Sequence, residues 1–587
     1  MTRPTPRSVN DQLLNLGLAA LAGGIVLIAA LRVAGSIAAW VSASPQPVGG
    51  PTTGLGVLAN PLDPGAALGA PGLNAILYWT VAVIIIAAPS GVVVWAVIRW
   101  RAGKQRVDVR TVKGVATGGE VAEVASAKAI TRRATTLRPS FEGRRAAPSD
   151  IGYLLGHSSG REVWATVEDS ILLIGPPRSG KGLHVIINGI LDAPGAVITT
   201  STRPDNLTVT LEARKRLGPV AVFDPQQLAP GLPVGLRWSP VRGCDDPLTA
   251  MIRATGLAAS TGFGDVESGG FWEGKTRAAI QALLHAAALD DRDARSLYQW
   301  ALSPAAAAEA VRILQGSSAA AEGWAESLDS MIDADPRTRD SIWQGVGLAF
   351  QSLADPRVLA AVTPAAGELF DPEAFLREKG SLYLLATAAG AGASAPLVAA
   401  FIEDLVEVAR RMAAKSSGSR LDPPVLMALD EIGNLAPLPS LPTLMAEGGG
   451  TGITTLPVLQ SLAQAREKWG EHNASAIWDA SIVKIILGGG SNARDLQDLS
   501  ALFGERDELT DSVSTDQYGG TSTSRSVRRV PVLPPDLLRS LPFGTGVVVL
   551  RSARPIVADL RPWTRRADAA RLTAERGDVE QTIRAAH

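Results

Sequence analysis

The sequence predicts an α/β protein with a phosphate-binding loop, interrupted by an all-α insertion and preceded by two transmembrane helices. From about residue 150 onward, short apolar runs rich in β-branched residues alternate with helix-like stretches. Between about Cys244 and Val358 this alternation stops, and the sequence is rich in alanine without a convincing strand. Two long uncharged stretches lie within the first hundred residues. A chain of 587 residues is long enough for several domains.

The composition excludes several classes of protein. The chain has 56 Lys and Arg against 57 Asp and Glu, so any contact with DNA must be local. Its single cysteine, Cys244, excludes an intramolecular disulfide and a multi-cysteine metal cluster, and it fits a catalytic body in a reducing cytoplasm. The histidines lack the spacing of zinc ligands. They are His157, His184, His285, His472 and His587.

Residues 1–105 are predicted to form a membrane anchor with two helices, at about 13–31 and 73–98. Each stretch is uncharged and long enough to cross roughly 30 Å of hydrocarbon. A signal peptide is the alternative for the first stretch, and a buried soluble helical hairpin is the alternative for the two stretches together. The apolar run is longer than a signal peptide requires, and no small-residue cleavage site follows it promptly.

The loop charges predict the orientation of this anchor. Arg3 and Arg7 precede the first stretch, whereas residues 41–72 contain only one charged residue, Asp63. Basic residues follow the second stretch: Arg99, Arg101, Lys104, Arg106 and Arg110. Because basic residues stay on the cytoplasmic side, we expect a multi-pass protein of the cell (inner or plasma) membrane with both termini in the cytoplasm. Residues 41–72 would form a short Pro/Gly-rich loop outside, and residues 106–150 a linker.

The sheet is expected to be parallel, with helices on both faces. Seven apolar runs are its predicted strands: 171–177, 195–202, 219–225, 380–387, 424–431, 452–460 and 546–550. Helix-like stretches separate most of them, as in a chain of βαβ units. The nucleotide-binding domain is therefore predicted at 151–243 and 359–587, with the all-α domain inserted at 244–358.

A phosphate-binding loop is predicted at Gly175–Gly182, with the sequence GPPRSGKG between an apolar strand and a helix-like stretch. Gly175 and Gly180 permit turns that direct N–H groups at phosphate, and Lys181 adds a positive charge. Gly182 stands where a Ser or Thr hydroxyl would ordinarily reach magnesium. A simple glycine-rich turn is the alternative. The candidate nucleotide-binding residues are Gly175, Pro176, Pro177, Arg178, Ser179, Gly180, Lys181, Gly182 and Leu183.

Two carboxylates follow the predicted strand at 424–431. Asp430, at the strand end, is placed to hold magnesium, and Glu431 to polarise an attacking water. A helix cap or a solvated turn would explain the pair equally well in isolation, but the upstream phosphate loop favours a nucleotide site. Gln460 ends the next strand and could sense the γ-phosphate or orient the water, or simply bond to the backbone.

The order of these motifs resembles the type IV secretion coupling proteins of the TraG/TraD class. The resemblance rests on the two membrane spans and on segments from residue 150 to 560: GPPRSGKG, STRPDN (201–206), VFDP (222–225), WSP (238–240), FWEGKTRAAI (271–280), LDEIGNL (429–435), VLQSLAQ (458–464) and the closing segment at 528–550. It implies a RecA-like P-loop NTPase domain with an inserted all-α domain. It also implies a homo-hexamer that uses ATP and Mg²⁺ to pump relaxase-bound single-stranded DNA, protein effectors or both toward a type IV secretion channel.

The resemblance assigns Asp430 to the metal, Glu431 to catalysis and Gln460 to sensing. Ser179 or water could replace the hydroxyl missing at position 182. An arginine finger cannot be placed; the candidates are Arg466, Arg494, Arg528 and Arg529. An FtsK-like double-stranded DNA translocase and a non-hydrolysing, nucleotide-switched docking scaffold are the alternative functions. An ABC transporter ATPase is disfavoured because no LSGGQ-like signature separates the two nucleotide motifs.

Overall fold

The computed structural model describes residues 9–104, 108–259, 269–365, 367–368, 370–386, 391–515 and 521–586. It divides into two units, one ending at Asp108 and one beginning at Val109. The units are described separately below.

The first unit is a helical hairpin closed by a small helical cap. Its long helices are α1, Val9–Val41, and α4, Ala75–Lys104, and the cap contains α2, Gly54–Ala59, and α3, Pro64–Leu68. The Arg32 side chain on α1 donates hydrogen bonds to the carbonyls of Pro47 (2.7 Å) and Gly49 (3.3 Å), which ties the cap to the helix. The loop predicted at 41–72 is therefore folded, with Val57, Leu68 and Ala70 buried against the long helices.

One stretch among the described residues, Gly23–Val41 in α1, is long and apolar enough to cross a membrane. At 33 residues, α1 would extend about 50 Å, more than a bilayer core needs. The second predicted span, 73–98, lies mostly in α4. There the apolar stretch within the described residues runs over Ala75–Ala88, which is shorter than a span requires. Two crossings are therefore not confirmed, and the second stays a prediction.

The described part of the second unit is built on an eleven-stranded sheet with the order β2-β1-β13-β12-β9-β3-β8-β7-β4-β6-β5. From β9 to β5, neighbouring strands run parallel. These strands are β3, Ile171–Ile174; β4, Val197–Ser201; β5, Val220–Phe223; β6, Ser381–Leu385; β7, Val425–Leu429; β8, Ile453–Leu459; and β9, Val483–Leu487. Alternate residues of β3 belong to different hydrophobic clusters, Leu172 to one and Leu173 to the other, because both faces of the sheet are covered.

The sheet is not wholly parallel, which corrects the sequence prediction. The predicted strand at 546–550 is present as β12, Thr545–Leu550, but it runs antiparallel to β9. A short turn joins it to β13, Ile556–Leu560, and a hairpin must be antiparallel. Two further antiparallel strands, β1 (Gly152–Ser158) and β2 (Arg161–Thr166), complete this side of the sheet.

The segment predicted as a linker, 106–150, is folded onto the sheet from Val109 onward. It forms the short helices α5, Gly118–Val124; α6, Ala127–Thr131; α7, Ala134–Leu137; and α8, Pro148–Ile151. Val121, Ile130 and Leu137 are buried in the same cluster as alternate residues of β3. Each helix is too short to show an apolar period in the sequence, which is why the segment resembles a linker.

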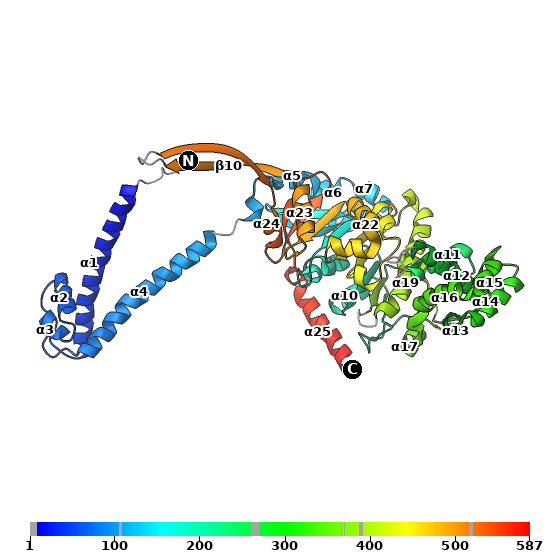
Figure 1. Cartoon of the computed structure of the whole chain (residues 1–587), viewed down its shortest axis with the longest axis horizontal. Helices are drawn as coiled ribbons and strands as arrows, with labels where there is room; N and C mark the ends of the chain where they lie inside the picture. Colours follow the sequence, from blue (N-terminus) through cyan, green and yellow to red (C-terminus); the bar gives the residue numbers. More distant parts are fainter. Residues whose placement is uncertain are drawn as a thin grey trace. The chain divides into compact units, whose positions relative to one another are not determined.

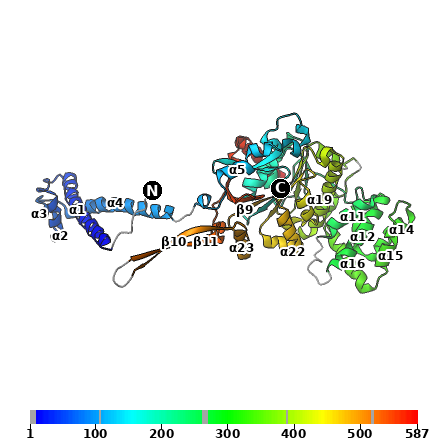
Figure 2. The same cartoon turned by 90° about the horizontal axis from the view of Figure 1, so that it is seen from above.

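Helices and no strand occupy the described residues of 244–358. They are α11, Pro247–Ala258; α12, Gly269–Leu289; α13, Ala294–Leu302; α14, Pro304–Gly316; α15, Trp324–Ile332; and α16, Pro336–Phe350, followed by α17, Pro356–Ala361, and α18, Pro372–Arg377. Figures 1 and 2 show α11–α16 gathered at one end of this unit, beside α19 (Ala391–Ala414). Trp300 and Phe350 share one continuous hydrophobic cluster with Ile198 of the sheet, so the helices extend the core.

The remaining helices flank the parallel strands: α9, Ile187–Asp192; α10, Asp205–Lys215; α20, Ile432–Leu435; α21, Leu441–Glu447; α22, Leu462–Ala480; α23, Ala493–Leu502; α24, Pro535–Arg539; and α25, Ala569–Ala586. A separate two-stranded ribbon, β10 (Glu505–Thr515) with β11 (Thr521–Pro531), projects away from the large sheet (Figures 1 and 2).

Candidate nucleotide site

The sheet order brings the predicted site residues together. β3, β8 and β7 are consecutive parallel strands, so their carboxyl ends lie at one edge of the sheet. The loop Gly175–Gly182 follows β3, Asp430 and Glu431 follow β7, and Gln460 follows β8. This edge is where parallel α/β sheets bind their ligands.

The phosphate loop turns sharply before the helix begins. Gly180 has φ +88° and Arg178 has φ +65°, so one residue with a side chain also adopts the left-handed conformation. The Lys181 ammonium, 9% exposed, donates to the Gly175 carbonyl at 3.0 Å and thereby folds back over its own loop. The next helical turn is a π-helix, Gly182–Ile186, which continues into α9.

His184 packs behind the loop. Its Nδ1 lies 3.0 Å from the Gly180 carbonyl, and its ring meets Phe543 edge-on at 5.1 Å. Burial lowers the pKa of His184 below its ordinary value. A Cβ at Gly180 would lie 2.6 Å from the His184 ring, so this glycine is required both for its backbone angle and for this close approach.

Glu431 is the centre of a polar network that joins the three strand ends. Its Oε1 lies 3.2 Å from Lys181 Nζ, and its Oε2 accepts hydrogen bonds from Gln460 Nε2 (2.9 Å) and Asn434 Nδ2 (3.0 Å). Gln464 donates in turn to Asn434 at 2.8 Å and accepts from the Gln460 backbone at 2.9 Å. Two strands and one helix therefore fix the carboxylate in a single orientation.

The backbone at Glu431 is itself unusual, because this glutamate has φ +52° at the start of α20. A non-glycine residue in the left-handed region is uncommon and is concentrated at functional sites. Thr200 of β4 donates to the Asp430 carbonyl at 2.8 Å, which fixes the peptide just before the strained residue.

Asp430 lies half-buried beside Glu431, and its Oδ1 atom is buried without a hydrogen-bond partner among the described residues. Burial raises the pKa of Asp430 to about 6, and the negative charge of Glu431 acts in the same direction, while Lys181 opposes the shift. The Ser179 hydroxyl in the phosphate loop is also buried without a described partner. Buried polar atoms in native proteins are ordinarily satisfied, so these two oxygens fit a bound cation or its water ligands.

A cavity of about 450 Å³ opens next to these groups. Its lining includes Arg178, Gly180, Lys181, Gly182, Leu183, Asp430 and Glu431, and residues of the STRPDN segment such as Arg203 and Asn206. Trp563 and Arg576 line it as well, although sequence reasoning did not identify them. They lie more than a hundred residues beyond the nucleotide motifs. The packing of α25 against α10, and of the 3-10 turn Trp563–Arg565 against the π-helix Gly182–Ile186, brings them to the cavity.

Three predicted loop residues lie at the margin of the site. Pro177 is exposed, Pro176 is half-buried within van der Waals contact of Gly489, and Leu183 packs into a small apolar cluster that contains Trp563. Leu183 therefore forms part of the cavity wall.

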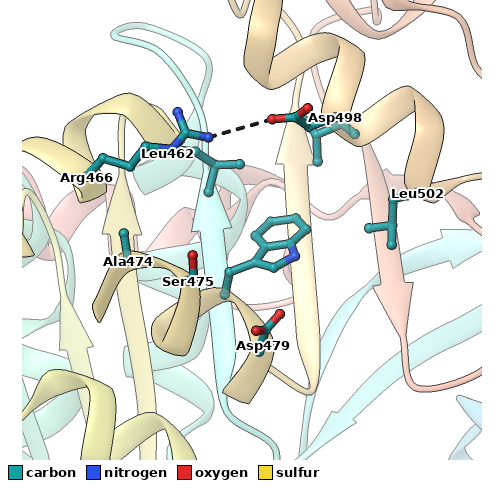
Figure 3. Close-up of a pocket in the computed structure, with 9 residues that line it drawn as sticks. Leu462, Arg466, Ala474, Ser475, Asp479, Asp498 and Leu502 are labelled. Carbon is teal, nitrogen blue, oxygen red and sulfur yellow. Dashed lines mark ion pairs between the residues drawn. The ribbon is translucent and has the colours of Figure 1, made fainter. Parts of the chain in front are cut away.

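The arginine-finger candidates are not in the lining of this chain's own nucleotide cavity. Arg466 on α22 pairs with Asp495 at 2.9 Å and with Asp498 at 3.7 Å, beside a different pocket of about 250 Å³ between α22 and α23 (Figure 3). Arg494 pairs with Glu471 at 3.3 Å and is exposed. Arg528 and Arg529 are exposed on the ribbon.

Together the fold and this edge of the sheet define an α/β protein with a candidate P-loop nucleotide site. Residues 424–543, which include Asp430, Glu431 and Gln460, match the family model described as the TraM recognition site of TraD and TraG. This match confirms the resemblance to the TraG/TraD coupling proteins that the motifs predict.

Solved structures with the same fold agree with this assignment. The bacterial conjugative coupling protein TrwBdeltaN70, in its unbound monoclinic form, is 18% identical with a TM-score of 0.51, covering 69% of this chain and 88% of that one. The plasmid coupling protein TrwB in complex with ADP and Mg²⁺ is 17% identical with a TM-score of 0.53, covering 75% and 93%. At these identities the likeness establishes the α/β fold. No curated protein sequence matches the chain.

Proposed function

We propose that this chain is a membrane-anchored coupling ATPase that recruits relaxase-bound DNA, protein substrates or both and moves them to a type IV secretion or conjugation channel. The observation that carries the proposal is the bonding of Glu431 to Lys181 of the phosphate loop and to Gln460 of the neighbouring strand, at 3.2 and 2.9 Å. A lysine, a carboxylate and a glutamine on three adjacent strand ends are the groups that nucleotide hydrolysis requires.

Each group has a distinct role in this proposal. Lys181 and the loop N–H groups bind the β- and γ-phosphates, since an ammonium at the start of a helix attracts anionic oxygens. Glu431 accepts a proton from the attacking water, and Gln460 orients that water or senses the γ-phosphate. The hydrogen bonds from Asn434 and Gln460 hold the carboxylate in place without occupying Oε1.

The donor set fits Mg²⁺ held by one carboxylate, Asp430, together with phosphate oxygens and water. When bound, the ion would neutralise charge on the β- and γ-phosphates. The proposed magnesium site lacks a hydroxyl at position 182, where the residue is glycine. Ser179, whose buried hydroxyl oxygen has no described partner, is the residue in the loop that could supply this hydroxyl instead. The TrwB structure that holds ADP and Mg²⁺ supports the use of these cofactors.

The partners follow from the family and from the anchor. The match to a TraM recognition segment supports contact with the machinery that prepares DNA for transfer. The apolar α1 stretch supports attachment to a membrane. None of the four arginine-finger candidates lines the chain's own cavity, which favours a ring, expected to be a hexamer, in which a neighbouring copy completes the site.

The test is steady-state ATP hydrolysis by the full chain in detergent, with and without single-stranded DNA, for the wild type and Glu431→Gln. Glutamine keeps the size and hydrogen bonding of the side chain but is not a base. Binding of a fluorescent ATP analogue should survive, whereas hydrolysis should fall by roughly two or more orders of magnitude.

The alternatives give different results. A nucleotide-switched scaffold would bind the analogue but show no turnover even in the wild type. An FtsK-like translocase would be stimulated by double-stranded DNA rather than by single strands. Hydrolysis by Glu431→Gln at the wild-type rate would show that the base lies elsewhere.

A further inference from the structure

Within the described part of the second unit, the ribbon β10–β11 is a long element that projects from the large sheet and its helices. Its pairing runs from Glu505–Pro531 to Thr515–Thr521 without a break. At its root, Phe503 and Leu533 are buried in the body. Beyond the root, the described side chains at 507–510 and 524–529 are all exposed, and both views show the ribbon extending away from the sheet (Figures 1 and 2).

Its charges are separated by strand. β10 carries four carboxylates and one guanidinium, whereas β11 carries three guanidinium groups and no carboxylate. The residues are Glu505, Arg506, Asp507, Glu508 and Asp511 on β10, and Arg525, Arg528 and Arg529 on β11. Because each strand is also an outer edge of the two-stranded sheet, one edge of the ribbon is acidic and the other is basic.

The ribbon is poorly stabilised by its own contacts. A two-stranded hairpin without a packed face is marginally stable in water. Leu509 and Val527 face each other across the strands, yet they are 64% and 63% exposed. The register sets Asp507 opposite Arg529 and Glu508 opposite Arg528. The ion pair between Asp507 and Arg529 is long, at 3.9 Å, and its side chains are 63% and 78% exposed, so it contributes little. Both outer edges present backbone N–H and C=O groups that pair with no other described strand.

We propose that the acidic β10 edge of one copy pairs with the basic β11 edge of a neighbouring copy. Pairing of strand edges satisfies the unpaired backbone groups, and side chains directly opposite one another come within about 4.5–5.5 Å, which places carboxylates beside guanidinium groups. The contact is head-to-tail, so every copy offers one edge of each kind, and such contacts form a ring when the rotation from copy to copy closes. The inference that the copies form a ring rests on the proposed function. The contact between ribbon edges does not require nucleotide hydrolysis.

The charge pattern favours this occupant over the other candidates. Nucleic acid or an anionic membrane would be attracted to β11 but repelled by β10. Charges that only protect an edge from aggregation would share one sign and repel a second copy. Because the two edges carry charges of opposite sign, the β10 edge of one copy is attracted only to the β11 edge of another copy.

Cysteine crosslinking tests the orientation. Thr510→Cys places a thiol on β10 and Ser526→Cys places one on β11; the native Cys244 is buried and unreactive toward a surface oxidant. The full chains are oxidised with copper phenanthroline separately and as a mixture. We expect a crosslinked dimer in the mixture and little in either variant alone. Dimers from Thr510→Cys alone would overturn the head-to-tail pairing, and so would a mixture without any crosslink at these or the adjacent ribbon positions.

Charge reversal tests the attraction between copies. In Asp507→Arg/Glu508→Arg the two strands of the ribbon have a net positive charge, because only Glu505 and Asp511 remain on them as carboxylates. In Arg528→Glu/Arg529→Glu they have a net negative charge, because only Arg506 and Arg525 remain as guanidinium groups. Each variant alone should need roughly tenfold or more protein to assemble in sedimentation, because like charges then meet at every contact. Mixing should restore assembly, since each copy then finds an opposite neighbour. Repulsion within each ribbon is unchanged by mixing, so recovery must come from contacts between copies; a mixture that stays dispersed overturns the proposal.

A third measurement separates this inference from the proposed function. Both dispersed variants should bind the fluorescent ATP analogue as well as the wild type does, because the ribbon contributes no residue to the nucleotide cavity. Absence of nucleotide binding in the wild type would contradict the proposed ATPase function. The crosslinking experiment would still test the contact between ribbon edges.

Discussion

Lys181 Nζ and Glu431 Oε1 lie 3.2 Å apart, so the cation that should bind phosphate is paired with the carboxylate that should activate water. Both side chains are largely buried, at 9% and 19% exposure, which strengthens their attraction relative to a surface pair. Phosphate oxygens that reach Lys181 therefore compete with Glu431 for the same ammonium. The arrival of nucleotide and the release of the base are consequently linked through one ion pair.

Lys181→Ala should abolish nucleotide binding. It removes the cation from the loop and leaves Glu431, a nearby carboxylate, to repel the phosphates. We expect the affinity for a fluorescent ATP analogue to fall by roughly two orders of magnitude or more, with turnover lost. Lys215→Ala is the matched control, because Lys215 is a surface lysine paired with Glu212. Unchanged binding by Lys181→Ala would remove this loop from the nucleotide site.

Gly182→Ser should strengthen the magnesium contact. A Cβ at this position meets only the Asn206 Oδ1, at 3.8 Å, so the side chain fits without displacement. The added hydroxyl stands where P-loop proteins ordinarily reach the metal. We expect Mg²⁺-dependent nucleotide affinity to rise by roughly threefold to tenfold. Gly182→Ala supplies the same Cβ without the hydroxyl, and equal behaviour of the two variants would contradict the prediction.

The raised pKa of Asp430, about 6, predicts two opposite pH effects. The folded chain keeps this proton up to about pH 6, whereas the unfolded chain loses it near the ordinary value of 3.8. This group therefore lowers the free energy of unfolding as the pH rises from about 4 to 6. Mg²⁺ needs the carboxylate, so Mg²⁺-dependent nucleotide affinity should rise over the same interval and level off above it.

The pH effect is measured from pH 5 to 7.5 by analogue binding with and without Mg²⁺. Asp430→Asn should lose the rise near pH 6. His184 also titrates beside the loop, with a lowered pKa, and it is retained in this variant. A slope that persists in Asp430→Asn would therefore belong to His184 or to the nucleotide.

The nucleotide edge could be predicted from the sequence because its signals are local. Asp430 and Gln460 each end an apolar run, and Lys181 lies in the glycine-rich loop that follows another; parallel strands bring such ends together. The strand adjacency that gives Glu431 two partners is not local, and neither is the return of Trp563 to the cavity. The sequence does not predict short helices such as α6, because they are too short to show a hydrophobic period. It does not predict β9 either, because Lys484 interrupts its apolar run.

Arg576→Ala should weaken nucleotide binding, because this guanidinium lines the cavity from α25. Its Nε now donates to Glu580 at 2.6 Å, and phosphate would compete for it as it does for Lys181. We expect roughly a tenfold loss of ATP affinity, the value of one hydrogen bond to a charged group. Arg584→Ala is the control: Arg584 pairs with the same Glu580 but does not line the cavity. Equal losses in both variants would assign the effect to the stability of the helix.

Removal of the first unit should leave a folded protein whose ATP hydrolysis rate depends on its concentration. A chain that begins at Val109 retains every described hydrophobic cluster of the second unit, including Val109 itself, which is 4% exposed. It should therefore be soluble and bind ATP. If a neighbouring copy completes the site, the specific hydrolysis rate should rise with protein concentration, since the anchor no longer holds copies together.

The rate is measured against protein concentration at two ionic strengths, alongside sedimentation. High salt should shift assembly to higher concentration, because the charged ribbon edges are exposed and screened. A second truncation, beginning at Ser126, is the matched control: it removes Val121 and Ala125, both fully buried against the sheet, and should lower the free energy of unfolding by roughly 2 kcal/mol or more. A chain from Val109 that hydrolyses ATP at the full rate at every dilution would exclude the shared site and leave a self-contained ATPase.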